Sequence, residues 1–97
     1  MSGSTTNLGD VSATLRSRLD ALQPQVLEIT DDSAAHAGHA GAAGGAGHFS
    51  VVIVSEVFRG LSRVQRHARV YREVADLLPY PVHALSIKAL APQELHA

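Results

Sequence analysis

The chain has 97 residues, a formal net charge of −1 and no cysteine. This length fits one domain of modest size, the near-neutral charge gives no global field that favours nucleic acid or an anionic membrane, and the lack of cysteine excludes disulfides and a cysteine nucleophile. No apolar run approaches the roughly 18 residues that a membrane helix needs, and the first ten residues lack the pattern of a secretory signal. We expect a cytoplasmic protein without membrane association.

The N-terminal part predicts a tail, a helix and a strand. Residues 1–6 are rich in Ser, Thr and Gly and are predicted to be a disordered tail. A helix is expected next, because apolar residues recur at every third or fourth position. These residues are Leu8, Val11, Leu15, Leu19 and Leu22. The segment VLEIT at 26–30 alternates as a strand does.

Residues 31–48 form a low-complexity run of Ala and Gly that carries His36, His39 and His48. Each glycine in this run disfavours a helix by roughly 1 kcal/mol, so we predict a long flexible loop. Loops of this length inside a compact domain are uncommon and are often functional.

A second helix is predicted after a turn at Gly60, from about Arg63 to Leu78, with Ser62 as its N-terminal cap. Its apolar spacing predicts one buried face. That face would consist of Val64, Ala68, Tyr71, Val74, Ala75 and Leu78.

Two strands flank this helix. The β-branched run at 49–55 predicts a strand at the centre of a sheet or covered on both faces. A third strand is predicted at 82–90, with His83, Leu85 and Ile87 on one face.

The predicted order is therefore helix, strand, loop, strand, helix, strand. A helical crossover between the last two strands favours a parallel pair with a right-handed connection, and the first two strands can pair antiparallel through the loop. The sequence predicts an α+β domain with a mixed three-stranded sheet and its helices packed on one face.

This topology predicts where the histidines meet. Parallel strands begin at the same end of a sheet, the histidine-bearing loop leads into the strand at 49–55, and His83 stands at the start of the strand at 82–90. The three loop histidines are therefore expected at the same end of the sheet as His83.

The stretch 48–94 resembles the BolA family in several motifs at matching spacing. The motifs are the strand VVIVS, Phe58 and Gly60 in F-x-G, Arg66 and His67 in an RH pair, VHALSI at 82–87, and Ala91 to Glu94, which is similar to the TPEE of the family. Upstream, LEITDDSAAH is similar to the start of the family's loop. The resemblance covers most of residues 10–95, so we assign 7–95 to a BolA-like domain. It implies a fold related to class II KH domains.

The resemblance implies a non-enzymatic partner of monothiol glutaredoxins. The two proteins would share a bridging [2Fe–2S] cluster, with glutathione and the glutaredoxin supplying thiolates, in iron–sulfur trafficking or iron regulation. It implies His83 and His36 as ligands, with His39 and His48 as alternates. Imidazole replaces thiolate on one iron of Rieske clusters. We expect a monomer when the chain is alone and a heterodimer when the partner is present. A heterodimer that holds no cluster is an alternative.

The resemblance also implies a second role, as a DNA-binding transcriptional regulator of morphology and stress responses. The arginines that would contact DNA or a protein partner are Arg59, Arg63, Arg66 and Arg69, and no acidic residue interrupts this stretch. A solvated helix face is the commonest alternative for such a run. His67 is predicted to be structural, buried against the sheet with a hydrogen-bond partner.

Overall fold

The computed structural model describes residues 8–33 and 47–96. Its helices and strands follow the predicted order. They are α1 (Leu8–Leu19), η1 (Asp20–Leu22), β1 (Val26–Asp31), β2 (Gly47–Val54), η4 (Glu56–Phe58), α2 (Arg63–Val74), η5 (Ala75–Leu77), β3 (Val82–Leu90) and η6 (Pro92–His96), where η marks a 3₁₀ helix. The predicted tail at 1–6 lies outside the described residues. Within the described ranges, no helix has the length and apolar character needed to cross a membrane.

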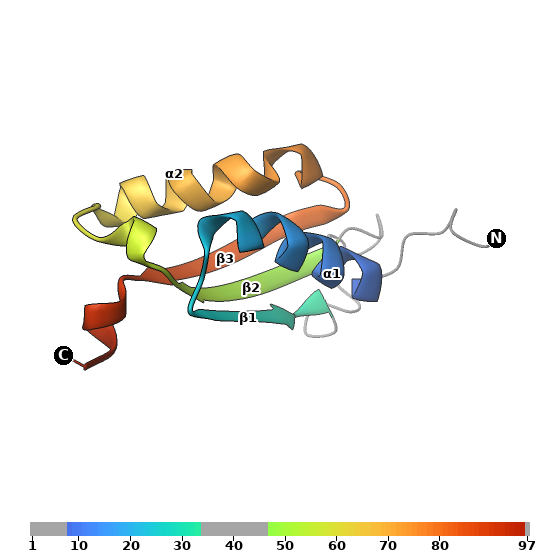
Figure 1. Ribbon diagram of the computed structural model, residues 1–97. Helices are drawn as coiled ribbons and strands as arrows, with labels where there is room; N and C mark the ends of the chain where they lie inside the picture. Colours follow the sequence, from blue (N-terminus) through green and yellow to red (C-terminus); the bar gives the residue numbers. More distant parts are fainter. Residues whose placement is uncertain (1–7, 34–46, 97) are drawn as a thin grey trace.

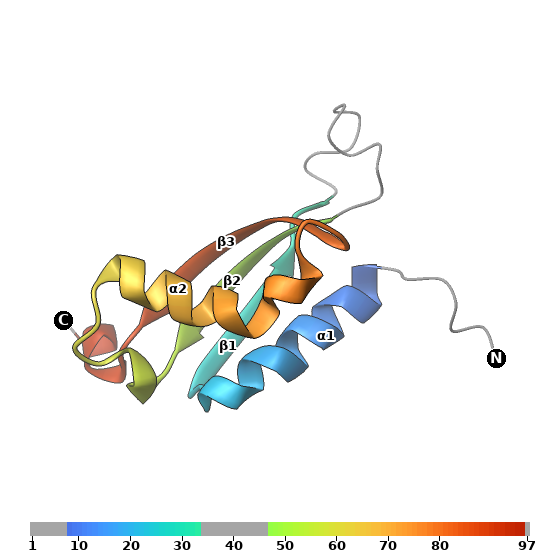
Figure 2. The same ribbon diagram turned by 90° about the horizontal axis from the view of Figure 1, so that it is seen from above.

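The sheet has three strands in the order β1-β2-β3. β1 pairs antiparallel with β2, and β2 pairs parallel with β3. Both α1 and α2 lie on one face of this sheet (Figure 1), and in the view from above they cross over the strands side by side (Figure 2). The predicted α+β class and mixed sheet are confirmed.

The core lies between the two helices and the sheet face that they cover. The apolar stripe of α1 and η1 is buried as predicted from Val11 to Leu22, and it meets alternate residues of β2. The fully buried members are Val11, Leu15, Leu19, Leu22, Phe49, Val51, Ile53, Phe58, Val70, Val74 and Val82. The opposite face of the sheet carries the intervening residues, and no helix of residues 8–33 and 47–96 lies over its middle (Figure 1).

The predicted loop at 31–48 is wrong at both ends. Asp31 belongs to β1, and Gly47 and His48 belong to β2, because pairing between these strands continues beyond the predicted bounds. The N–H of Asp32 donates to the carbonyl of His48 (2.7 Å), and the N–H of His48 donates to Ser33 Oγ (3.0 Å). Residues 34–46 lie outside the described part of the chain.

The start of α2 is fixed by its cap. Ser62 Oγ accepts a hydrogen bond from the N–H of Gln65 (3.1 Å), and the Gln65 side chain accepts one from the N–H of Ser62 (2.8 Å). This reciprocal pair is a capping box. The preceding turn places Gly60 at φ 78°, a conformation that favours glycine. The helix ends at Val74 rather than Leu78, and a 3₁₀ turn follows.

The predicted buried face of α2 is wrong for most of its members. Val64 is 77% exposed and Tyr71 is 37% exposed, and Ala68 and Ala75 are exposed as well. Of the predicted face, Val74 is buried and Leu78 is half-buried.

The buried stripe of α2 runs through Val70, Val74 and Leu77. One turn before Val70 it continues through Arg66, whose side chain is only 13% exposed. Its guanidinium reaches the carbonyl of Ala89 and the carboxylate of Glu94. A buried charge is tolerated when it is paired and hydrogen-bonded. A prediction from hydrophobicity alone does not place an arginine in a buried stripe. It therefore assigns the buried face of α2 to the wrong side of the helix.

Ser55 is a buried polar residue that joins the end of β2 to the end of the first helical segment. Its hydroxyl donates to the carbonyl of Leu22 (2.5 Å) and accepts from the N–H of Val57 (3.2 Å). The Ser55 hydroxyl thus satisfies backbone groups of two separate segments.

We expect Ser55→Ala to lower the free energy of unfolding by about 1–3 kcal/mol, because a buried carbonyl and an N–H each lose a partner. Urea unfolding followed by circular dichroism measures this change. The exposed Ser86→Ala on β3 is the control and should stay within about 0.5 kcal/mol of the parent. Equal stability of the two variants would contradict the role given to Ser55.

Candidate functional site

A bulge in β3 sets the direction of His83. Gly47 pairs with Val82 and His48 pairs with Ala84, so β3 has one more residue than β2 between these pairs. Val82 and Leu85 are both buried, three positions apart, whereas His83 and Ala84 are both exposed. A bulge places one extra residue opposite its partner and redirects its side chain. The prediction that His83 shares a face with Leu85 and Ile87 is therefore wrong.

His83 and His48 form a pair at the end of the sheet where β2 and β3 both begin. Their ring centroids lie 5.2 Å apart, with the ring planes at 43°. His48 alternates with the core residue Phe49, so its ring lies on the sheet face that the helices leave uncovered. The expectation that a loop histidine and His83 meet at one end of the sheet is confirmed for His48.

Polar neighbours hold the backbone of His48. Asp32 and Ser33 bond to the backbone of His48, and Ser33 N–H donates to Asp31 Oδ1 (2.8 Å). Ser50, the next residue on the same face of β2, donates its hydroxyl to Asp32 Oδ2. The strand end that carries His48 is thus tied to the end of β1, which fixes the position from which its ring projects.

The described residues supply two imidazoles here, and no group of three or more potential metal-ligating side chains occurs among them. His36 and His39, the other predicted ligands, lie outside the described residues.

The four arginines predicted to contact a partner or DNA differ in their surroundings. Arg59 pairs with Glu56 (2.8 Å) and Arg69 with Glu73 (3.3 Å). Arg66 pairs with Glu94 (2.7 Å). Among the described residues, Arg63 makes no ion pair. Most of the predicted cationic surface is therefore neutralised within the chain.

Arg66 holds three segments together. Its Nε donates to the carbonyl of Leu61 (3.0 Å), and its Nη1 donates to the carbonyl of Ala89 (3.0 Å). Its second interaction with Glu94 makes the ion pair bidentate, and Glu94 also accepts from the N–H of Ala91 (2.6 Å). The sequence analysis missed these contacts of Arg66 with Ala89 and Glu94, because neither spacing nor hydropathy links residues so distant in the chain.

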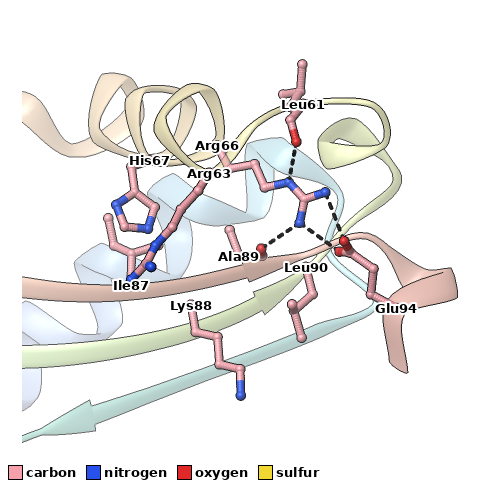
Figure 3. A pocket seen from close by; sticks show the side chains of 9 residues that line it. All are labelled: Leu61, Arg63, Arg66, His67, Ile87, Lys88, Ala89, Leu90 and Glu94. Carbon is pink, nitrogen blue, oxygen red and sulfur yellow. Dashed lines mark hydrogen bonds and ion pairs between the residues drawn. The ribbon is translucent and has the colours of Figure 1, made fainter. Parts of the chain in front are cut away.

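A groove of about 590 Å³ lies between the N-terminal half of α2 and β3 (Figure 3). It is lined by Leu61, Arg63, Arg66, His67, Ile87, Lys88, Ala89, Leu90 and Glu94. His67 is half-buried in its wall, and its ring makes no hydrogen bond to any described residue. The prediction that His67 is buried against the sheet with a hydrogen-bond partner is therefore wrong in the hydrogen bond and holds only in part for the burial, because the position of His67 on α2 faces the groove.

A family model described as BolA-like protein matches residues 19–94. Human BolA-like protein 1 is 43% identical over 88 residues, which cover 90% of this chain and 62% of that protein. The chain thus spans somewhat less than two thirds of its length. The protein named DNA-binding transcriptional regulator BolA of Haemophilus influenzae is 36% identical over 75 residues, or 77% of this chain and 70% of the relative.

Two solved structures are similar over most of the chain. The BolA domain of SufE1 from Arabidopsis thaliana is 42% identical, with a TM-score of 0.78, and the match covers 90% of this chain and 98% of that domain. The solution structure of BolA1 from Mus musculus is 40% identical, with a TM-score of 0.76 and coverage of 99% and 76%.

The hydrogen bonds from Arg66, and then that from Ala91, hold the pKa of Glu94 below its ordinary value of 4.5. A carboxylate with a depressed pKa in the folded state stabilises that state above the unfolded pKa, and this contribution disappears as the pH falls through the folded pKa. When the pH is lowered from about 7 to about 3, we expect the free energy of unfolding of Glu94→Gln to fall by less than that of the parent.

Urea unfolding at the two pH values measures this difference. Glu28→Gln is the matched control, because Glu28 is exposed on β1 and makes no ion pair with any described residue. It should show the same loss on acidification as the parent. An identical loss in all three proteins would contradict the coupling of Glu94 to Arg66.

Proposed function

The chain belongs to the BolA family, and from this membership we propose that it is a non-enzymatic partner of a monothiol glutaredoxin that shares a bridging [2Fe–2S] cluster with it. The role would lie in iron–sulfur trafficking or iron regulation. The observation that carries the proposal is the pair of imidazoles, His48 and His83, at the end of the sheet where β2 and β3 begin, in a chain without cysteine.

The residues present fit such a cluster as a shared group. Imidazole nitrogen is a known ligand of one iron in a [2Fe–2S] cluster, and the other iron then needs thiolates from elsewhere. This chain has no thiolate to offer. A glutaredoxin and glutathione would supply them, and the cluster would not be held by this chain alone.

His83 is the ligand that we propose from this part of the chain, because its ring is exposed and its bulge aims it out of the core. The second ligand is one of three histidines. His36 is the one that the family resemblance implies, with His39 as its alternate, and His48 is the one whose ring lies beside His83.

The test is visible circular dichroism of a cluster-loaded monothiol glutaredoxin mixed with this protein and glutathione. We expect the parent to change the spectrum and His83→Ala to leave it unchanged, because one iron would lose its imidazole. The second ligand is the histidine among positions 36, 39 and 48 whose substitution has the same effect.

His67→Ala is the matched control, because His67 lies on α2 in the groove wall and away from the start of β3. It should change the spectrum as the parent does. A parent-like change with His83→Ala would remove His83 from the ligands, and a change that survives all four substitutions would refute the histidine-ligated cluster.

DNA binding is a second candidate function, and one observation favours it: a relative with 36% identity is named as a DNA-binding regulator. The structure limits how this chain could do so. Two arginines of α2 make no ion pair with any described residue, namely Arg63 and Arg72. Arg59, in the turn before α2, is paired with Glu56.

If DNA binding is a function of this chain, its affinity for duplex DNA should fall steeply with salt, because phosphate contacts release counterions. Arg63→Glu should then weaken binding more than Arg59→Glu, since Arg59 is neutralised internally. Fluorescence anisotropy in a salt series measures both effects. Equal losses in the two variants, or no salt dependence, would contradict a phosphate contact at Arg63.

A further inference from the structure

The groove between α2 and β3 is separate from the histidine pair. It adjoins the C-terminal half of β3, whereas His83 lies at the start of that strand. Figure 3 shows Arg63, Arg66 and His67 descending from α2 toward the strand, with Lys88 on the other side of it. The proposed cluster does not use this part of the molecule.

β3 is an edge strand of the sheet, because β2 is its one partner among the described strands. Its outward carbonyls at Leu85 and Ala89 accept hydrogen bonds from side chains of α2, namely the Tyr71 hydroxyl (3.0 Å) and Arg66 Nη1 (3.0 Å). Backbone groups alternate in direction along a strand. The N–H and C=O of Ile87, halfway between these two carbonyls, therefore point outward as well.

No described residue bonds to this outward N–H or C=O of Ile87. Tyr71 and Arg66 thus cap the edge on both sides of a short open segment. Exposed edge groups of this kind form a template for an added strand, and the open segment provides one donor and one acceptor, as a pairing strand requires.

The helix flank above this edge is apolar and exposed. Val64 is 77% exposed and Tyr71 is 37% exposed, one helical turn to either side of the wall residue His67. Below them, Leu61 and Ile87 are half-buried in the groove. An extended chain in the groove would cover these apolar side chains, which water now contacts.

The charges at the rim are positive. Arg63 and Lys88 are exposed and make no ion pair with any described residue. They lie on opposite sides of β3 (Figure 3). The Arg66 and Glu94 charges compensate each other. Successive side chains of an added strand point to opposite faces, so acidic residues on a bound strand could reach either cation.

We propose that the α2–β3 groove binds an extended acidic segment of a partner protein, which adds to the edge of β3 at Ile87. Strand addition combines main-chain hydrogen bonds with pockets for alternate side chains. A peptide backbone satisfies both the N–H and the C=O of Ile87. The exposed Val64 and Tyr71 beside the edge offer an apolar surface to the side chains of a peptide, and this favours a peptide over a nucleic acid as the occupant.

The probe is an acetylated peptide amide of alternating valine and glutamate, six residues long, added to the nitrogen-15-labelled protein alone. We expect its addition to shift the amide resonances of Leu85, Ile87 and Ala89 and to slow hydrogen exchange at Ile87. The same peptide with lysine in place of glutamate, or with alternate backbone nitrogens methylated, should bind at least about tenfold more weakly. Neither glutaredoxin nor a cluster is present, so the result is independent of the proposed function.

The variant Arg63→Glu/Lys88→Glu should lower the affinity for the acidic peptide by about tenfold or more. Arg72→Glu, an exposed cation on α2 outside the groove, should change binding by less than about twofold. The amide spectrum of each variant checks its fold.

Any one of several results would overturn the proposal. The first is peptide-induced amide shifts that map outside the groove, and the second is equal affinity for the lysine or methylated peptide. The third is a loss of affinity with Arg72→Glu equal to that with Arg63→Glu/Lys88→Glu. The fourth is tighter binding of single-stranded oligothymidine at the same amides. Shifts at these amides that grow with protein concentration in the absence of peptide would identify a second copy of the chain as the occupant, and would also overturn it.

Discussion

The parallel pairing of β2 with β3 is the constraint on which the rest of the molecule depends. Because the two strands run in the same direction, α2 must cross from the end of one to the start of the other, and it covers the sheet face that α1 also covers. The same pairing brings His48 and His83 to one end of the sheet although 34 residues separate them in sequence. It leaves β3 as an edge along which α2 forms a groove.

Much of the fold could be predicted from the sequence. The strand at 82–90 has the predicted bounds, and the stripe from Val11 to Leu22 is buried as its spacing indicates. The stripe is predicted correctly because a single helical period explains it. The resemblance to the BolA family, carried by motifs such as VHALSI, agrees with the matching family model over residues 19–94.

The failures arose where a distant contact overrides the local pattern. The bulge at His83 depends on its register against Gly47 and His48, which no property of the strand itself reveals. Which face of α2 is buried depends on Arg66. Its burial is tolerated only because Glu94 and the carbonyl of Ala89 accept hydrogen bonds from its guanidinium. The candidate site could be located from topology, but the direction of its side chains could not, and His36 and His39 lie outside the described residues.

The claim at the centre of this account is that an imidazole of this chain ligates iron in a shared cluster. Pulsed electron paramagnetic resonance of the reduced complex tests it most directly, with only this protein labelled with nitrogen-15 and the glutaredoxin at natural abundance. The account predicts strong nitrogen-15 coupling of the size of directly bound imidazole, and its reduction or loss in His83→Ala. A complex whose cluster shows no such coupling, or keeps it unchanged in His83→Ala, would contradict the account.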